Sequence, residues 1–323
     1  MTRKISEQNL KLTQAAQLTK QASILYQQGN YSKAILKTKE ALEIRKTILG
    51  NEHIKVAVTL NNLATLYNAQ GNYSEVELLL KQAIKLYQKN LGEEHPSVAT
   101  GLNNLALLYN AQGKYSQAEF GFKQALEITK KSQGEEHIDV ATALNNLALL
   151  YNAQKRYTQA EPLLKQSLEI RKKLQGEGDI EVATALNNLG FLYNYQRRYS
   201  EAECLFKEAL EFSKKLLGEE NHYVAGSLNN LGTLYNEQKR YSEAETFLQQ
   251  ALMIYKKILG ENHPYLIQTF SNLATLYNNQ DKYAQAEIFY EQAIKLSKEL
   301  LGENHPNTKT IMQHYLSMKY RMS

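Results

Sequence analysis

The chain has 323 residues with a formal net charge of +5, and 22% of its residues are charged. It has no apolar run of the 18 or more residues that a membrane-spanning helix requires, which argues against a membrane protein. Its single cysteine excludes an intramolecular disulfide and fits a reducing compartment, so we expect a cytoplasmic protein.

The first 50 residues differ from the sequence that follows them. Residues 1–9 are polar and are expected to form a tail. Residues 10–50 are predicted to form a divergent N-terminal repeat, in which Lys20 occupies the position of Asn62 in the next repeat. Such divergence is expected at the end of a repeat array, because one face of the terminal repeat has no neighbour.

Residues 51–302 consist of six repeats of 42 residues with no insertion or deletion. Counting the divergent repeat, a tyrosine opens the second half of each repeat: Tyr31, Tyr73, Tyr115, Tyr157, Tyr199, Tyr241 and Tyr283. A glycine closes each repeat: Gly50, Gly92, Gly134, Gly176, Gly218, Gly260 and Gly302. A fixed period of this length predicts stacked structural units rather than a single globular core.

Each repeat is predicted to contain two helices. In residues 141–176, one run has apolar residues at i, i+3, i+4 and i+7, the period of one helix face: Leu144, Leu147, Ala148 and Tyr151. A second run contains Ala160, Leu164 and Leu168. It ends at Gly176, where glycine can adopt the left-handed closing conformation. We therefore expect two antiparallel helices of about 17 residues in every repeat.

Residues 303–323 are predicted to form a C-terminal capping helix. They begin like another repeat, but Lys319 stands where Tyr277 would recur. A lysine in this packing position is compatible with a repeat that has no second helix, because nothing then has to pack against it.

Residues 144–160 resemble the tetratricopeptide repeat in the order Leu144, Leu147, Ala148, Tyr151, Tyr157 and Ala160. The usual unit of that family has 34 residues. The 42-residue unit and the phrases LNNLALLYNAQGKY and GEEHP are similar to the repeats of kinesin light chains and their bacterial relatives. The resemblance extends over about residues 10–320. It implies an all-α fold, a right-handed α-solenoid (superhelix) of antiparallel helix pairs, which acts as a protein-binding scaffold or adaptor.

Five histidines stand just before the first helix of a repeat: His53, His95, His137, His263 and His305. Residues one repeat apart cannot converge on a metal ion, whose ligands lie about 2 Å from it. We therefore interpret these histidines as helix-start residues and expect no metal site. The chain also has no phosphate-binding glycine loop, nucleophile elbow or CxxC motif, so we expect no cofactor and no enzyme activity.

One face of the first helix in each repeat is predicted to be the binding surface. On a helical wheel, Leu60 and Leu63 face the second helix of the repeat, whereas Asn62 points the opposite way. The resemblance implies that this opposite face lines a concave surface, where an asparagine column contacts peptide backbone. The predicted peptide-binding groove contains Asn62, Asn104, Leu107, Asn146, Leu149, Asn188, Phe191, Tyr195, Asn230 and Asn272.

The groove asparagines that recur with Asn62 form what we call the Asn62 column. An amide side chain supplies one carbonyl and two N–H donors, so a row of asparagines can pair with an extended peptide. Alternatively, these side chains bridge adjacent helices or hold water. We favour peptide contact for the Asn62 column. Bridging is expected for a second column, Asn61, Asn103, Asn145, Asn187 and Asn229.

The turn between the two helices of a repeat changes along the chain. Its glycine column continues as charged residues: Gly29, Gly71, Gly113, Lys155, Arg197, Lys239 and Asp281. If the glycines adopt positive φ, the later side chains cost about 1 kcal/mol each. The arginines that follow complete a predicted basic rim: Lys155, Arg156, Arg197, Arg198, Lys239 and Arg240. This rim is either a solvated edge or a surface for an acidic partner.

The sequence thus predicts a protein-interaction scaffold that holds an extended peptide in its groove. A regulatory or assembly subunit that docks a folded partner domain is an alternative. Nucleic-acid binding is disfavoured, because most of the 22 tyrosines belong to packing columns and the 38 basic residues are accompanied by 33 acidic ones. The identity of the partner and the oligomeric state do not follow from these patterns.

Overall fold

The computed structural model describes residues 2–175 and 178–322, which form fifteen α-helices and no β-strand. The predicted all-α solenoid of antiparallel helix pairs is confirmed. The chain divides into two compact units, residues 1–150 and 151–323. Over the described residues, no helix has both the length and the apolar character needed to cross a membrane.

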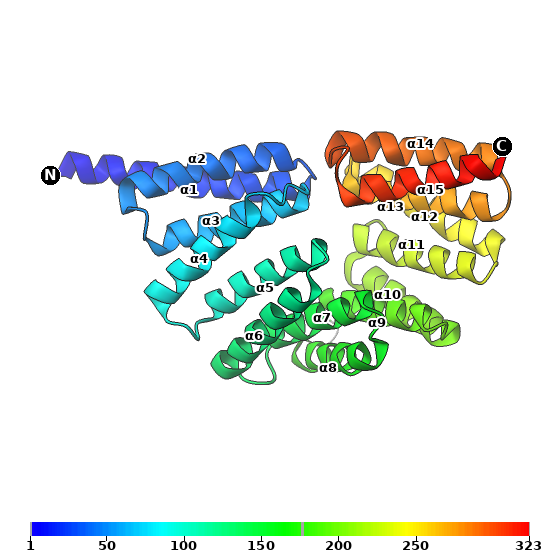
Figure 1. The fold of residues 1–323 in the computed structure, drawn as a ribbon, viewed down its shortest axis with the longest axis horizontal. Helices are drawn as coiled ribbons and strands as arrows, with labels where there is room; N and C mark the ends of the chain where they lie inside the picture. Colours follow the sequence, from blue (N-terminus) through cyan, green and yellow to red (C-terminus); the bar gives the residue numbers. More distant parts are fainter. Residues whose placement is uncertain (1, 176–177, 323) are drawn as a thin grey trace. The chain divides into compact units, whose positions relative to one another are not determined.

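The first unit contains three complete helix pairs and most of α7. Its helices are α1 (Thr2–Gln27), α2 (Tyr31–Leu49), α3 (Ile54–Ala69), α4 (Val76–Leu91), α5 (Pro96–Ala111), α6 (Tyr115–Gln133) and α7 (Ile138–Ala153). Each helix from α1 to α5 contacts the next one, and α3 also contacts α5. Consecutive pairs are therefore stacked in chain order, with the first helices of neighbouring repeats side by side (Figure 1).

The second unit repeats this arrangement. Its helices are α8 (Tyr157–Gln175), α9 (Glu181–Tyr195), α10 (Tyr199–Leu217), α11 (His222–Glu237), α12 (Tyr241–Leu259), α13 (Pro264–Asn279), α14 (Tyr283–Leu300) and α15 (Pro306–Met322). Each of these helices contacts the next, and α11 also contacts α9 and α13. The first helices of neighbouring repeats therefore stack on one another in this unit as well.

Two columns of the repeat fill the core of the helix pairs. An alanine of the second helix is completely buried in six repeats: Ala34, Ala118, Ala160, Ala202, Ala244 and Ala286. A tyrosine of the first helix is buried in the 42-residue repeats: Tyr67, Tyr109, Tyr151, Tyr193, Tyr235 and Tyr277. Small alanines allow the paired helices to approach closely, and the tyrosine rings fill the remaining space. These tyrosines are core residues, as predicted.

Helix α4 begins one turn later than the other second helices. Those helices start at the predicted tyrosine, as α6 does at Tyr115, whereas α4 starts at Val76 rather than Tyr73. Val76 stands in the alanine column, and a β-branched residue is a poorer helix former than alanine.

The glycines that close the repeats have positive φ, but their conformation is not the compact left-handed one that we predicted. For Gly50, Gly92 and Gly134, φ is 86°, 91° and 88°, and ψ is 161°, 162° and 165°. Positive φ combined with extended ψ is accessible essentially to glycine alone. The closing glycine Gly176 lies outside the described residues.

Both ends of the described part of the chain are helical. Helix α1 starts at Thr2, so most of the stretch predicted as a polar tail continues the helix of the first repeat. At the other end, α15 packs on α14 and buries Ile311 and Met318. Lys319 forms an ion pair with Glu287, so the lysine in the tyrosine position acquires a partner on the preceding helix.

Candidate functional site

The predicted groove face of the first helices is accessible in both units. In α3, Val58 and Thr65 are exposed and Asn62 is half-buried. Leu60 and Leu63, on the opposite side, are buried in the core. Every member of the Asn62 column is half-buried: Asn62, Asn104, Asn146, Asn188, Asn230 and Asn272.

In the first unit, two asparagines of this column bridge neighbouring helices. Asn104 Nδ2 on α5 donates a hydrogen bond of 3.0 Å to Asn61 Oδ1 on α3. Asn146 Nδ2 on α7 donates one of 2.8 Å to Asn103 Oδ1 on α5. The two asparagine columns therefore form a ladder between consecutive first helices. Because an amide has two N–H donors and a carbonyl, each bridge uses only part of the side chain's hydrogen-bonding capacity.

The bridges differ in the second unit. Asn272 Nδ2 donates a hydrogen bond of 3.1 Å to Thr233 Oγ1, and Asn187 Nδ2 donates one of 3.3 Å to Ser227 Oγ. The Oδ1 atoms of Asn187 and Asn229 are buried and accept no hydrogen bond from the described residues. The asparagines therefore stabilise the helix stack to different extents along the chain.

The four apolar residues of the predicted groove are divided between the units. Leu107 is half-buried and Leu149 is 36% exposed in the first unit. In the second unit, Tyr195 is 58% exposed. Phe191 is half-buried, and its ring meets the buried Phe206 edge-on with centroids 5.3 Å apart. Tyr195 is therefore the accessible aromatic residue, whereas Phe191 also belongs to the core.

The first residue of each basic dipeptide in the rim has a strained backbone. Lys155, Arg197 and Lys239 have φ angles of 59°, 61° and 60°, and their side chains are exposed. Gly71 and Gly113 adopt comparable φ angles of 75° and 72° in the first unit. A non-glycine residue in this conformation costs about 1 kcal/mol, so the rim lies where the turns are least favourable.

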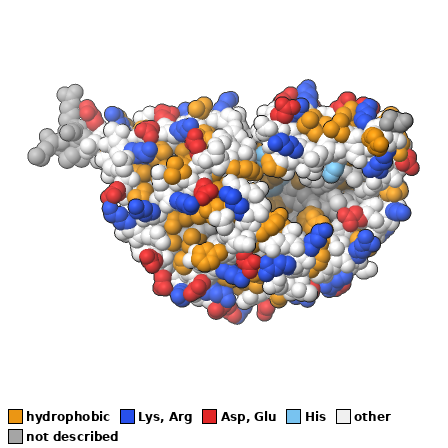
Figure 2. Space-filling view, viewed as in Figure 1, with side chains coloured by type: hydrophobic (Ala, Val, Ile, Leu, Met, Phe, Trp, Pro, Cys, Tyr) orange, Lys and Arg blue, Asp and Glu red, His pale blue; other side chains and the backbone are white. Residues whose placement is uncertain are grey.

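The second residue of each dipeptide is engaged within the chain. The Arg198 guanidinium lies 3.8 Å from the ring centroid of Tyr193 and forms an ion pair of 3.0 Å with Glu161. Arg156 and Arg240 stack on the tyrosines of their own repeats at 4.2 Å and 4.0 Å. The outward positive charge of the rim is therefore carried by its exposed first residues. Elsewhere on the face drawn in Figure 2, acidic and basic side chains are interspersed.

A glutamate column on the second helices was not among the predicted site residues: Glu77, Glu119, Glu161, Glu203, Glu245 and Glu287. Glu203 accepts a hydrogen bond of 2.9 Å from Tyr235 Oη of the next repeat and forms ion pairs with Lys207 at 2.7 Å and Arg240 at 3.1 Å. Burial raises the pKa of Glu203, but these partners outweigh it and lower the pKa overall. The signal was present in the 42-residue spacing and in a lysine four residues later in four repeats: Lys81, Lys123, Lys165 and Lys207.

The histidine column caps the first helices, which confirms its interpretation as a helix start. His53 Nδ1 accepts a hydrogen bond of 3.0 Å from the backbone N–H of Lys55, two residues later. The same contact occurs at His95, His137, His263 and His305. Asp179 and Asn221 cap their helices with side-chain oxygens instead. Among the described residues, no three His, Cys, Asp or Glu side chains are grouped as metal ligands.

His305 is expected to make the stability of the C-terminal helix depend on pH. Its Nδ1 accepts a hydrogen bond of 3.1 Å from Asn307 N, which requires the neutral ring, and burial lowers the pKa of His305 from its ordinary 6.5. The unfolded chain therefore binds this proton more tightly than the folded chain. The stabilising contribution is complete above pH 6.5 and is lost as the pH falls from 6.5 toward the lower folded-state pKa.

Urea unfolding of the wild type and His305→Asn at about pH 7.5 and 5.5 measures this contribution. Asparagine can also cap a helix, as Asn221 does, but it does not titrate. We expect the substitution to remove up to about 1 kcal/mol of the pH dependence of the unfolding free energy. The same pH dependence in both proteins would contradict the assignment.

Comparison with known proteins identifies the repeat. The family model of the tetratricopeptide repeat matches residues 13–89, 79–131, 139–215, 223–299 and 265–322. BtubC (BKLC) from P. vanneervenii is 23% identical, covers 78% of this chain and 92% of its own, and has a TM-score of 0.55. A putative kinesin light chain from Podosopora anserina is 26% identical, with coverages of 64% and 98% and a TM-score of 0.53. A Rap protein in complex with competence and sporulation factor is 17% identical, with coverages of 97% and 88% and a TM-score of 0.63.

None of the curated proteins compared matches the chain. The family matches nevertheless extend over most of the sequence, and the 42-residue unit agrees with the helix spacing. Similar solved structures include kinesin light chain-like proteins with the same kind of repeat. The chain belongs to the tetratricopeptide repeat family.

Proposed function

We propose that the chain is a cytoplasmic, non-catalytic scaffold that binds an extended peptide segment of a protein partner on the groove face of its first helices. The observation that carries this proposal is the half-buried Asn62 column, whose amides retain hydrogen-bonding capacity beyond the bridges between helices. An extended backbone presents a donor and an acceptor at almost every residue, so a repeated amide suits it. Membership of the tetratricopeptide repeat family supports a protein partner.

Tyr195 is the proposed aromatic anchor of the groove in the second unit. Aromatic residues often supply a large share of interface energy, and this side chain is 58% exposed. We expect Tyr195→Ala to weaken partner binding by about 1 to 2 kcal/mol, roughly tenfold, with little change in the melting temperature. Affinity purification with mass spectrometry would identify the partner, and calorimetric titration would then measure the change.

Tyr115→Ala is the matched control, because Tyr115 is 42% exposed on α6, outside the predicted groove. Equal losses of affinity in the two variants, or unfolding of Tyr195→Ala, would refute the anchor. Synthetic segments of the partner test the binding mode. If the folded partner binds but none of its segments does, a regulatory or assembly subunit that docks a folded domain becomes the better description.

We further propose that the exposed rim residues attract an acidic region of the partner. Arg197→Gly removes both the charge and the backbone strain of this turn, and the two losses have different measurable effects. Glycine adopts positive φ without strain, so we expect a gain in stability of up to about 1 kcal/mol. Loss of the charge should slow association and weaken its salt dependence, measured by stopped-flow mixing at low and high salt. A stabilised variant with an unchanged association rate would leave the rim as a solvated edge.

A further inference from the structure

A cavity in the first repeat arises because one core position lacks its usual large side chain. In the other repeats this position of the second helix is a fully buried leucine, phenylalanine or tyrosine: Leu80, Phe122, Leu164, Phe206, Leu248 and Tyr290. The first repeat has Thr38, which is also buried but much smaller. A cavity of about 310 Å³ lies between α1, α2 and α3, and Thr38 is one of the residues that line it.

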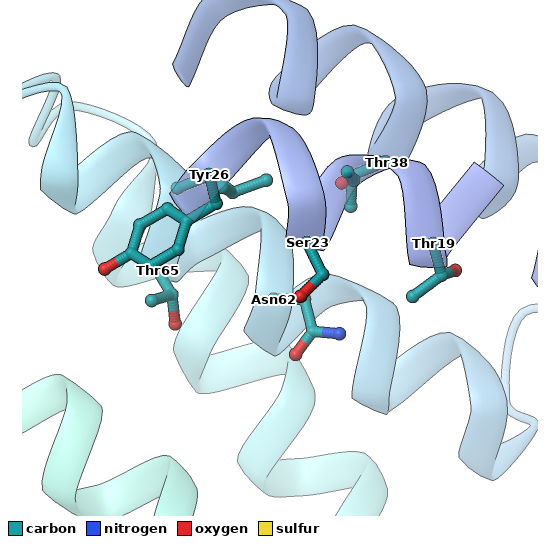
Figure 3. A pocket seen from close by; sticks show the side chains of 8 residues that line it. Thr19, Ser23, Tyr26, Thr38, Asn62 and Thr65 are labelled. Carbon is teal, nitrogen blue, oxygen red and sulfur yellow. The ribbon is translucent and has the colours of Figure 1, made fainter. Parts of the chain in front are cut away.

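Most of the residues that line the cavity carry a polar side-chain group, whereas its exposed lining surface is mainly apolar (Figure 3). Thr19, Ser23 and Tyr26 come from α1, and Asn62 and Thr65 come from α3. In the close-up, Ser23 and Asn62 lie next to each other, with Thr19 toward one end and Tyr26 and Thr65 toward the other. The cavity therefore opens on the predicted groove face and includes a member of the Asn62 column.

Asn62 differs from Asn104 and Asn146 because its bridging partner is missing. Asn104 donates to Asn61, and the residue that corresponds to Asn61 one repeat earlier is Thr19. The Thr19 hydroxyl already donates a hydrogen bond of 2.9 Å to Ala15 O and accepts one of 3.0 Å from Arg45 Nη2. Within the described residues the Asn62 side chain forms no hydrogen bond, so its whole amide is available in the cavity.

Arg45 supplies a positive charge beside the cavity. It lies seven residues after Thr38 on α2, and both residues are on the same face of that helix. Its half-buried guanidinium contacts only the hydroxyls of Thr19 and Thr59, with no carboxylate partner among the described residues. Burial lowers the pKa of Arg45, as expected for a guanidinium partly removed from water. A guanidinium has five N–H donors, so further acceptors can be bound.

In the fourth repeat, the arginine that corresponds to Arg45 has a carboxylate partner. Arg171 stands in the column of Arg45, and its Nη1 lies 3.6 Å from Asp179 Oδ2. His53, just after the first repeat, stands where Asp179 follows the fourth, so the carboxylate is missing from the chain at this place. Buried charges are normally paired, and a carboxylate is the acceptor that matches a guanidinium best.

We infer that this cavity binds a side-chain carboxylate, from Asp or Glu, of the peptide segment held in the groove. Arg45 pairs with the carboxylate, the Asn62 amide hydrogen-bonds it, and Thr19 and Ser23 supply further polar contacts. No lysine or arginine lines the cavity, and Arg45 adjoins it through its hydrogen bond to Thr19, so a single positive charge is near and suits a monoanion rather than a phosphate dianion. This inference rests on the proposed peptide-binding function and names the chemistry of one subsite.

The test uses the full chain, selectively labelled with ¹⁵N-asparagine, and two probes: N-acetyl tetraglutamate amide and N-acetyl tetraglutamine amide. The Asn62 side-chain NMR signal is assigned from its loss in Asn62→Ser. We expect tetraglutamate to shift this signal in a saturable manner and tetraglutamine to leave it unchanged.

Two variants test the site itself. Arg45→Gln should weaken tetraglutamate binding at least about tenfold. Thr38→Leu should abolish it, because it restores the side chain that Leu80 and Leu164 supply in other repeats.

Lys55→Gln is the charge control, since Lys55 is exposed at the start of α3 and does not line the cavity. The affinity of this variant for tetraglutamate should stay within twofold of the wild-type affinity. Equal tetraglutamate binding by Thr38→Leu and the wild type overturns the site, as does an equal Asn62 shift with tetraglutamine. If inorganic phosphate binds as tightly as tetraglutamate, the site takes a free anion and the peptide assignment is wrong. The effect of Tyr195→Ala in the second unit tests the proposed peptide-binding function independently. A failure of the carboxylate site can therefore be distinguished from a failure of the proposed function.

Discussion

Replacing Gly190 with alanine is expected to lower the free energy of unfolding of the second unit by about 2 to 3 kcal/mol. A Cβ atom at this position would lie 2.6 Å from Cε1 and 2.8 Å from Cδ1 of Phe206. Phe206 is completely buried and its ring also packs against Phe191, so the ring cannot move away without displacing other core groups. In an open helix interior the same substitution would stabilise by about 1 kcal/mol, so even the sign of the effect is informative.

The fourth repeat suggests how the loss can be reversed. It has Ala148 and Leu164 at the equivalent positions, both buried. Phe206→Leu should therefore relieve the overlap, and urea unfolding of both single variants and the double variant should give a coupling energy of about 2 kcal/mol. Gly178→Ala is the control, because a Cβ there meets no atom within 4 Å. Additive losses in the double variant would show that the overlap is not the cause.

Replacing Glu203 with alanine is expected to cost about 2 kcal/mol of unfolding free energy. The substitution removes the shared acceptor of Tyr235, Lys207 and Arg240, and so loosens the contact between consecutive repeats. The Glu203 side chain is 21% exposed, so solvent screens the loss only in part. Glu243→Ala is the matched control. It removes the other carboxylate partner of Arg240, is 50% exposed, and should cost clearly less than Glu203→Ala because solvent screens its charge.

The cost of Glu203→Ala should also depend on pH. The folded-state pKa of Glu203 lies below its ordinary 4.5, so the carboxylate stabilises the fold fully above that pH. This contribution is lost as the pH falls through 4.5 toward the lower folded-state value. Urea unfolding at neutral and acid pH should therefore show the two proteins converging as the pH falls. A difference that stays constant down to about pH 3 would assign the loss to packing rather than charge.

Much of the fold follows from the sequence because the repeat is locally defined. The 42-residue period, the two helices and their buried faces depend on residues within one repeat, such as Leu144, Leu147 and Tyr151. A helix of about 17 residues shows its apolar face in its own spacing, so no knowledge of neighbouring repeats is needed. The cap at His53 also follows, since its acceptor and donor are only two residues apart. The strained turns at Lys155 and Arg197 were expected from the glycines that precede them in the same column.

Contacts between repeats were decided only by the tertiary structure. Arg198 reaches Glu161 across 37 residues, whereas Asn104 reaches Asn61 across 43, and neither separation equals the period of 42. These separations depend on how far each side chain extends from its helix and on which neighbour it meets. The sequence therefore showed Arg198 as part of a basic rim but not that a neighbouring repeat neutralises it.

The Asn62 column illustrates the same limit. In the sequence Asn62 and Asn104 are equivalent, and both were expected to contact peptide. In the structure Asn104 bridges to Asn61, whereas Asn62 faces Thr19 and a cavity above Thr38. The hydrogen-bonding groups that a residue can offer to a ligand are those that its neighbours leave unused. Those neighbours come from other helices, so they are known only once the helices have been packed together.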